Sequence, residues 1–273
     1  MKLFRNTGTI VEQSGRYYAV EESWDAVIAR EDVEAYLQSK IDSRSLKAAS
    51  APQNLAAPVV NQEIWAAGVT YLRSRDARME ESKSAGGGNF YDRVYAAERP
   101  ELFFKSAGHR AVGTGGHVRI RRDSKWNVPE PELTLAIASS GKIIGYTVGN
   151  DMSSRDIEGE NPLYLPQAKV YDGACAVGPC ILLSTKPLPP ETLIEISIVR
   201  AGQEVFSGAT PISRIKRDLQ SLADYLYRET TFPHGALLMT GTGVVPADTF
   251  TLQSQDQVAI TIAPIGTLLN TVQ

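Results

Sequence analysis

The stretch PEPEL at residues 129 to 133 constrains the fold more than any other part of this chain. Residues 133 to 148 alternate apolar and polar side chains around a Ser-Ser-Gly-Lys turn, which predicts a β-hairpin. Proline cannot donate a ladder hydrogen bond, so the two prolines place the start of this hairpin at an edge or rim of a sheet. Residues i and i+2 of a strand project to one side, so Glu130 and Glu132 should stand together.

The remaining patterns predict a strand-rich protein with few helices. A second hairpin is expected over residues 193 to 209, and two strands are expected over residues 257 to 272. An apolar stripe with helical spacing predicts one amphipathic helix over residues 212 to 229. Strands do not alternate regularly with helices, so we expect a β-dominated α+β fold rather than a doubly wound sheet.

The first part of the chain differs in composition from the rest. It contains a strand-like run at Arg16 to Val20 and a helical candidate at Glu31 to Lys40, and it ends in the Ala/Pro-rich stretch KAASAPQNLAAP. Such a stretch is typical of a linker. We therefore expect a small N-terminal domain with its linker at residues 1–58 and a catalytic domain at residues 59–273.

Composition narrows the class of protein. The chain has 273 residues, 22% charged residues and a formal net charge of -3, which argues against a nucleic-acid partner. No apolar run approaches the roughly 18 residues of a membrane span, and the first residues lack a secretory apolar region. Cys175 and Cys180 fit neither a zinc spacing nor a disulfide framework. We expect a cytoplasmic globular protein that has no membrane partner.

Asp151 adds a third carboxylate to the pair in PEPEL. It follows the return strand of the predicted hairpin, which brings it back toward the level of Glu130 and Glu132. Neighbouring carboxylates raise each other's pKa unless a cation lies between them. Hard oxygen ligands suit Mg²⁺, with Ca²⁺ or Mn²⁺ as alternatives. A solvated, charged rim without metal is the competing interpretation.

Three segments in order, PEPEL, GYTVGNDMSSRD and AKVYDGACAVGP, resemble the metal-binding core of the fumarylacetoacetate hydrolase family. The resemblance implies a roll of mixed β-sheets around one site. By position, it makes Glu130, Glu132 and Asp151 the metal ligands and Lys169 the active-site lysine. It also implies that Thr242, with its neighbour Gly241 in the T-G-T loop, holds the carboxylate of the substrate.

One departure from the family pattern bears on the reaction. Members that cleave carbon–carbon bonds carry a G-x-N-Y-x-x-H-x-x-E segment, whose His and Glu form a general-base pair. Here the segment reads GVTYLRSRDA, with Ser74 and Ala77 at those positions, and neither can accept a proton at pH 7. The dehydratase branch of the family lacks the pair too. The resemblance therefore implies a hydro-lyase that converts a 2-keto-3-deoxy pentonate, a small 2-oxo acid, into 2,5-dioxopentanoate.

The sequence does not assign the proton-transfer and substrate-binding roles to single residues. Lys169 and Glu101 are the candidates for proton transfer, although Lys169 could be only an ion-pair partner and Glu101 plain surface. Further candidates for substrate binding are Lys105, Tyr164, Tyr71 and Arg75. Arg155 and Asp156 are expected to brace the turn at Asp151 rather than to contact substrate.

The alternative functions are acylpyruvate hydrolysis, oxaloacetate decarboxylation, dienoate isomerisation, or a metal-stabilised binding protein without catalysis. A homodimer or homotetramer is expected from the family resemblance.

Overall fold

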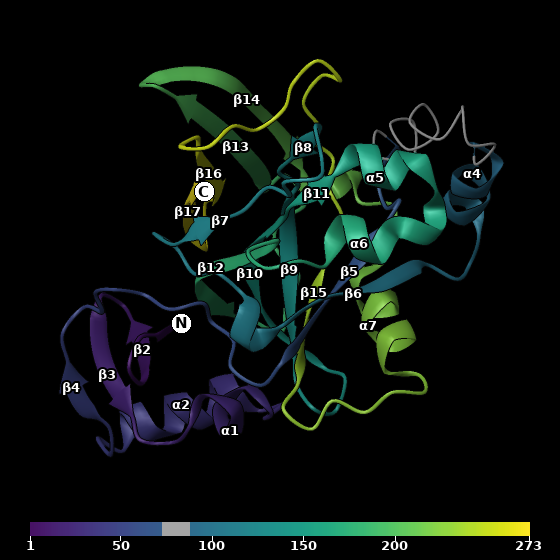
Figure 1. The fold of residues 1–273 in the computed structure, drawn as a ribbon. Coiled ribbons are helices and arrows are strands. Elements are labelled where there is room, and N and C mark those ends of the chain that lie inside the picture. Colours follow the sequence, from purple (N-terminus) through teal and green to yellow (C-terminus); the bar gives the residue numbers. More distant parts are fainter. Residues whose placement is uncertain (73–87) are drawn as a thin grey trace.

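The computed structural model describes residues 1–72 and 88–273 (Figure 1). Strands dominate it, which confirms the expected β-dominated α+β class. The strands are β1 Lys2–Arg5, β2 Thr9–Gln13, β3 Arg16–Val20, β4 Lys47–Ala49, β5 Glu63–Gly68, β6 Glu101–Ala107, β7 His117–Val118, β8 Asn127–Val128, β9 Pro131–Ile137, β10 Ile143–Asp151, β11 Ser153–Ser154, β12 Cys175–Leu183, β13 Leu193–Arg200, β14 Gln203–Pro211, β15 Ala236–Met239, β16 Gln257–Ile262 and β17 Gly266–Val272.

The helices are short and lie between the strands. The α-helices are α1 Trp24–Ile28, α2 Val33–Asp42, α4 Gly88–Ala96, α5 Arg155–Glu160, α6 Leu165–Lys169 and α7 Leu219–Tyr227, and 3-10 turns cover η2 Gly108–Arg110, η3 Pro162–Tyr164 and η4 Ile212–Arg214. The predicted hairpins at residues 133–148 and 193–209 form as β9–β10 and β13–β14, and the predicted strands of the tail form as β16 and β17.

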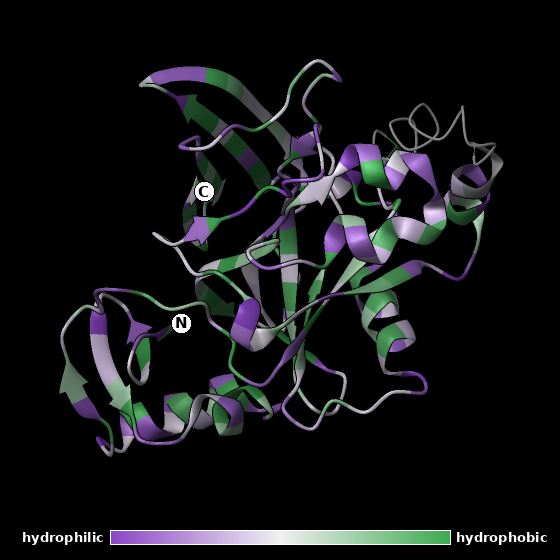
Figure 2. Cartoon of the chain, in the orientation of Figure 1, coloured by the Kyte–Doolittle hydropathy of each residue, from purple (hydrophilic) through white to green (hydrophobic). Residues whose placement is uncertain are grey.

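Two sheets make up most of the fold. One has ten strands in the order β4-β3-β2-β1-β12-β10-β9-β15-β5-β6, and the other has five in the order β14-β13-β16-β17-β7. A two-stranded ribbon, β11-β8, lies beside helix α5 (Figure 1). In Figure 2, hydrophobic residues gather on the central strands, whereas α5 and several loops carry hydrophilic ones.

The two faces of the ten-stranded sheet bury different partners. Leu133 and Leu135 of β9 belong to a core that includes Ile196 and Ile260 of the five-stranded sheet. Ala136, which alternation directs to the opposite face, belongs to a second core with residues of α1 and α2. Glu132 shares the face of Ala136. The site therefore lies on the side of the sheet that the five-stranded sheet leaves free.

The prolines of PEPEL lie at the end of an interior strand, not on an edge strand. β9 stands between β10 and β15, and Pro131 is its first residue. The ladder to β15 begins only at Thr134, which pairs with Met239, so no strand requires a donor from Pro131 on that side. Of the two predicted positions, edge strand or rim of a sheet, the prolines therefore occupy the rim.

The helix predicted over residues 212 to 229 is shorter than expected. A 3-10 turn occupies 212–214, the chain is extended at Ile215, and α7 begins at Leu219. Asp218 accounts for this start, because its side chain accepts a hydrogen bond from Ser221 N at 2.8 Å and caps the helix. The apolar residues keep their helical spacing across the break, so the sequence pattern predicted one helix where the structure has the 3-10 turn and α7.

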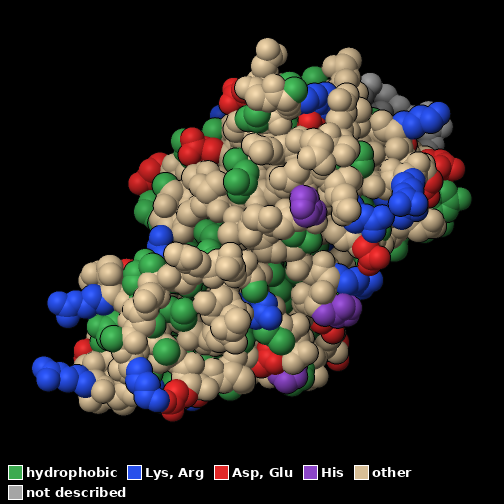
Figure 3. Space-filling model, turned by 60° about the vertical axis from the view of Figure 1, so that its left-hand side comes forward, with side chains coloured by type: hydrophobic (Ala, Val, Ile, Leu, Met, Phe, Trp, Pro, Cys, Tyr) green, Lys and Arg blue, Asp and Glu red, His purple; other side chains and the backbone are tan. Residues whose placement is uncertain are grey.

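The predicted linker at residues 47–58 is only partly irregular, because β4 pairs with β3 at its start. None of the helices among residues 1–72 and 88–273 is long and apolar enough to cross a membrane. On the face drawn in Figure 3, Lys and Arg side chains are interspersed with Asp and Glu.

Candidate metal centre

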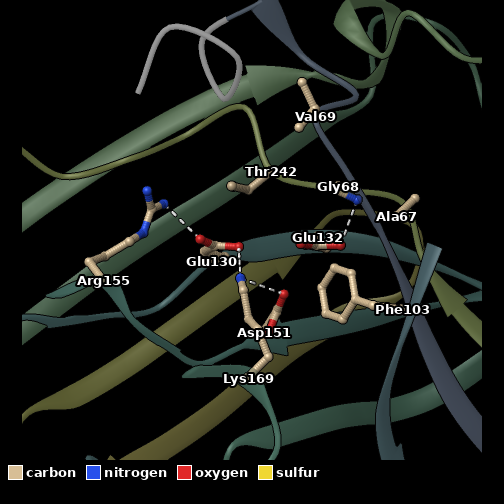
Figure 4. Close-up of a pocket in the computed structure, with 11 residues that line it drawn as sticks. Ala67, Gly68, Val69, Phe103, Glu130, Glu132, Asp151, Arg155, Lys169 and Thr242 are labelled. Carbon is tan, nitrogen blue, oxygen red and sulfur yellow. Dashed lines mark hydrogen bonds and ion pairs between the residues drawn. The ribbon is translucent and has the colours of Figure 1, made fainter. Parts of the chain in front are cut away.

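Three buried carboxylates meet where β9 begins and β10 ends (Figure 4). The antiparallel register pairs Glu132 with Gly149, and Asp151 N donates to Glu130 O at 3.0 Å. Glu130, Glu132 and Asp151 each offer an oxygen atom, and these oxygens lie within 4.8 Å of one another. The hairpin therefore brings together the three side chains that the sequence proposed as ligands.

Lys169, the last residue of α6, contacts two of these carboxylates. Its fully buried ammonium group lies 2.9 Å from Glu130 Oε2 and 3.0 Å from Asp151 Oδ2, and it donates to Ser153 Oγ at 2.6 Å. The same group lies 5.7 Å from the centre of the Phe103 ring. A lysine held this way can exchange a proton with a ligand bound between the carboxylates.

Two further cations complete the set. Arg155 Nη2 lies 2.6 Å from Glu130 Oε1. Lys105 Nζ lies 2.5 Å from Asp151 Oδ1 and donates to the main-chain oxygens of Met152 (2.9 Å) and Lys169 (2.6 Å). The three cations thus pair with Glu130 and Asp151, whereas no described ion pair reaches Glu132. The pairing matters because an unpaired buried charge is strongly destabilising.

The donor set fits Mg²⁺. The ion prefers carboxylate and water oxygens and is commonly held by few protein ligands. The carboxylates are buried, close together and all negatively charged when ionised, so a divalent cation would relieve their repulsion. Residues Ala67, Gly68 and Phe103 add a less polar wall to the same pocket (Figure 4).

The carboxylate of Glu132 accepts a hydrogen bond from the loop that follows β15. The main-chain N–H of Gly241 donates to Glu132 Oε2 at 2.6 Å, and Thr242 lines the pocket next to it. Burial, followed by the charges of Asp151 and Glu130, raises the pKa of Glu132 well above its ordinary value, while Lys169 and the Gly241 N–H oppose this. Burial, together with the charge of Glu132, also raises the pKa of Tyr71 and keeps its phenol neutral.

Glu101 lies beside Gly68, a residue of the pocket wall, because the two residues pair across β5 and β6. The register of β5 and β6 sets these residues opposite each other. A side chain on Gly68 would place its Cβ 2.1 Å from Glu101 Oε2, so the carboxylate of Glu101 occupies the space beside Gly68. Along β6, every second residue projects to the same face, and these residues are Glu101, Phe103 and Lys105. This spacing can be recognised in the sequence.

The structure does not bring every candidate to the pocket: Glu101, Lys105 and Tyr71 are not among its described lining residues, although Lys105 pairs with Asp151. Tyr164 lies in a short turn with 38% of its surface exposed and is absent from the described pocket lining. Arg75, Ser74 and Ala77 lie outside the described residues. Thr242 lines the pocket, and its hydroxyl donates to Val244 O at 3.1 Å.

Sequence reasoning missed the direct contact of Arg155 with Glu130. The expectation that Arg155 and Asp156 brace the turn at Asp151 stays a prediction; Asp156 accepts hydrogen bonds from Ser124 Oγ (2.6 Å) and Lys125 N (2.7 Å). Arg155 begins α5 directly after β11, and this position turns its side chain toward the carboxylates. No periodicity in the sequence predicts such a turn between two elements.

Comparison with known proteins agrees with this geometry. Two curated relatives are a probable 2-keto-3-deoxyxylonate dehydratase of Haloferax volcanii, 49% identical over 216 residues, and the 2-dehydro-3-deoxy-D-arabinonate dehydratase of Saccharolobus solfataricus, 43% identical over 218 residues. Each alignment covers 79% of this chain and 73% of the relative. A solved structure, 2-keto-3-deoxy-D-arabinonate dehydratase complexed with magnesium and 2,5-dioxopentanoate, superposes with a TM-score of 0.83 at 33% identity, covering 100% of this chain and 99% of that one.

Residues 64–273 match the model of the C-terminal domain of fumarylacetoacetate (FAA) hydrolase. This range holds every described residue that lines the metal centre, from Ala67 on β5 to Thr242 after β15. The fold, the carboxylate set and the relatives agree, and the chain belongs to the fumarylacetoacetate hydrolase family.

Proposed function

We propose that this chain is a magnesium-dependent dehydratase that removes water from a 2-keto-3-deoxy pentonate to give 2,5-dioxopentanoate. The observation that carries the proposal is the buried set of Glu130, Glu132 and Asp151 with Lys169 against it. The names of the two dehydratases at 43% and 49% identity, and the ligands of the solved dehydratase, support the same reaction.

The residues of the pocket fit a 2-oxo acid. Glu130, Glu132 and Asp151 would hold the ion, which when bound acts as a Lewis acid and increases the acidity of the C3 protons. Thr242 would receive the carboxylate of the substrate, because it lines the pocket on the loop beside Glu132, whereas the N–H of its neighbour Gly241 is already donated to Glu132 Oε2. Tyr71 is buried behind the described lining and stays neutral, so it is suited to hydrogen bonding rather than to ion pairing.

Lys169 and Glu101 would carry the protons. One of them removes a proton from C3, and the other protonates the C4 hydroxyl group, which leaves as water. The hydroxyenone that remains loses one proton from C5 and one from the C5 hydroxyl group, and gains one proton at C3 and one at C4, so C5 ends as an aldehyde. The sum is the loss of one water molecule without oxidation or reduction, and it needs more than one proton transfer, which matches two proton-carrying side chains.

A substrate panel tests the reaction. Purified protein with Mg²⁺ is given 2-keto-3-deoxy pentonates in one series and acylpyruvates or oxaloacetate in another. We expect an aldehyde product from the pentonates, identified as 2,5-dioxopentanoate by mass spectrometry. Release of pyruvate from an acylpyruvate without turnover of any pentonate would contradict the proposal and select carbon–carbon cleavage.

Glu132→Gln tests the metal site. The change removes a charge but little volume, so we expect the fold to persist while activity falls by more than the roughly 10–100-fold that loss of an outer partner of a metal site causes. Calorimetric titration with Mg²⁺ should show weakened binding, and excess EDTA should abolish the activity of the unsubstituted protein. Full activity in EDTA would show that the site does not work through a metal.

We also propose that the protein is cytoplasmic, that it acts in pentose catabolism, and that it forms a homodimer or homotetramer. Both cysteines are free and buried, which accords with a reducing compartment. Light scattering after gel filtration would give the number of copies, and a monomeric mass would contradict the assembly.

A further inference from the structure

The peptide group that joins Thr240 to Gly241 is held at both ends. Its N–H donates to Glu132 Oε2 at 2.6 Å. Its carbonyl oxygen accepts a hydrogen bond from the hydroxyl of Thr70 at 2.6 Å. Thr70 and Glu132 are both buried, so neither hydrogen bond is readily replaced by solvent. A trans peptide directs its N–H and C=O in opposite directions, so fixing one end fixes the other.

Thr70 also occupies the space where a side chain at position 241 would lie. A Cβ on Gly241 would come 2.0 Å from Thr70 Oγ1, and Gly241 itself has φ +90°, a conformation that favours glycine. Glycine leaves this peptide free to rotate, and a rotated peptide would direct its carbonyl oxygen toward the Glu132 carboxylate. The Thr70 hydroxyl opposes that rotation, because it binds the same carbonyl from the far side.

We propose that Thr70 is a positioning residue for the metal centre, acting through the Thr240–Gly241 peptide to hold the Glu132 carboxylate in the orientation that binds the cation. The inference rests on the proposed function, because it takes the cation to be Mg²⁺. Thr70 stands at the position where the G-x-N-Y pattern of the carbon–carbon-cleaving members has Asn, and here its hydroxyl lies against Gly241.

Thr70→Val tests this inference, because it keeps the shape of the side chain and removes only the hydroxyl. We expect the dissociation constant for Mg²⁺, measured by calorimetry on the protein without substrate, to rise about tenfold, as for other outer partners of a metal site. The Mg²⁺ concentration for half-maximal activity should rise equally, and saturating Mg²⁺ should restore kcat to within about threefold. Thr70→Ser keeps the hydroxyl and should bind Mg²⁺ within about twofold of the unsubstituted protein.

Thr147→Val is the matched control. Thr147 is also buried, and its hydroxyl donates to the main-chain oxygen of Gly178 at 3.3 Å, but it makes no described contact with the loop at Gly241. This variant should leave Mg²⁺ binding unchanged. If Thr70→Val does not fold, Thr70→Cys takes its place, since a thiol fills similar space and is a weak donor.

Three results would overturn the inference. The first is a Thr70→Val protein that binds Mg²⁺ as the unsubstituted protein does. The second is equal weakening by Thr147→Val, which would indicate a general effect of losing a buried hydroxyl. The third is an unsubstituted protein that dehydrates a pentonate without binding Mg²⁺. Failure of the substrate panel with normal Mg²⁺ binding would instead remove the proposed reaction and leave the role of Thr70 standing.

Discussion

Val69 shows how a single residue shapes the wall of the pocket. It lies in the left-handed region with φ +54°, which is rare for a β-branched side chain, and it is buried at the pocket. The chain turns sharply there, so that β5 ends at Gly68 and Thr70 reaches the loop at Gly241. Backbone strain of this kind concentrates at functional sites, where the surrounding packing holds it in place.

At position 69 we expect glycine to give a more stable protein than alanine, which is the reverse of the usual order of stability. Glycine adopts positive φ without strain, so we expect Val69→Gly to be more stable than Val69→Ala by about 1 kcal/mol in urea unfolding. Ala67, two residues earlier on β5, is the control, and Ala67→Gly should destabilise by about 0.5–1 kcal/mol. A more stable Val69→Ala would show that residue 69 is not held at positive φ in solution.

At the scale of elements, strand register decides which side chains meet. β5 and β6 pair Gly68 with Glu101, and β9 and β10 pair Glu132 with Gly149. In both pairs a glycine stands opposite a glutamate of the site. A Cβ on Gly149 would come 2.3 Å from Thr134 Oγ1, so this glycine too leaves room for a neighbouring side chain.

Gly68→Ala tests the placement of Glu101. The new methyl group would displace the flexible carboxylate rather than the backbone, so we expect a small change in Tm and a fall in kcat of about 100-fold, typical of a misplaced reacting group. Gly8→Ala is the control, because nothing lies within 4 Å of the added Cβ. An unchanged kcat in Gly68→Ala would argue against proton transfer by Glu101.

A pH-dependent ion pair ties α2 to the segment before α1. Glu22 Oε1 lies 2.5 Å from Lys40 Nζ and accepts a hydrogen bond from the Tyr36 hydroxyl. The hydrogen bonds from Lys40 and Tyr36 lower the pKa of Glu22 from 4.5 to about 2. A lowered pKa means that the folded state favours the ionised form, so this stabilisation is present above about pH 4.5 and is lost as the pH falls toward 2.

Glu22→Gln should therefore be less stable than the unsubstituted protein at pH 7, and the difference should shrink as the pH falls below about 4.5. Urea unfolding of both proteins at pH 7, 5, 4 and 3 measures it. A difference that stays constant over this range would mean that the charge of Glu22 contributes nothing, and only its shape matters.

At the scale of the whole molecule, the N-terminal residues share structure with the rest of the chain. β1 pairs with β12, with Leu3 opposite Ile181, and so continues the ten-stranded sheet. Val27 and Leu37 of the N-terminal helices belong to the same core as Leu237 of β15. In Figure 1 the N-terminal strands and helices lie against one end of the larger body. The division into residues 1–58 and 59–273 stays a prediction.

This shared core leads us to expect cooperative unfolding. Calorimetry of the full chain should show one transition, because separating residues 1–58 would expose β12 as a new sheet edge together with the apolar residues of the common core. A chain that starts at residue 59 should aggregate for the same reason. Two resolved transitions, or a soluble truncated chain, would indicate independent domains.

Much of the fold was predictable because it depends on local periodicity. The hairpins β9–β10 and β13–β14 follow from alternation and turn residues, and the class follows from the excess of strands over helices. The boundary of α7 was not predictable from the stripe alone, because the capping side chain of Asp218 competes with it locally. Arg155 was missed as a contact of Glu130 because its direction depends on how α5 leaves β11.

The sequence by itself determined that Glu130, Glu132 and Asp151 would converge, since strand alternation and a hairpin are local and their geometry is nearly fixed. Only the tertiary structure decided what surrounds them. Lys105, Lys169 and Arg155 reach the carboxylates from β6, α6 and α5, and Thr70 reaches Glu132 through a peptide 170 residues away. Contacts between distant segments depend on how whole elements pack, which no local pattern encodes.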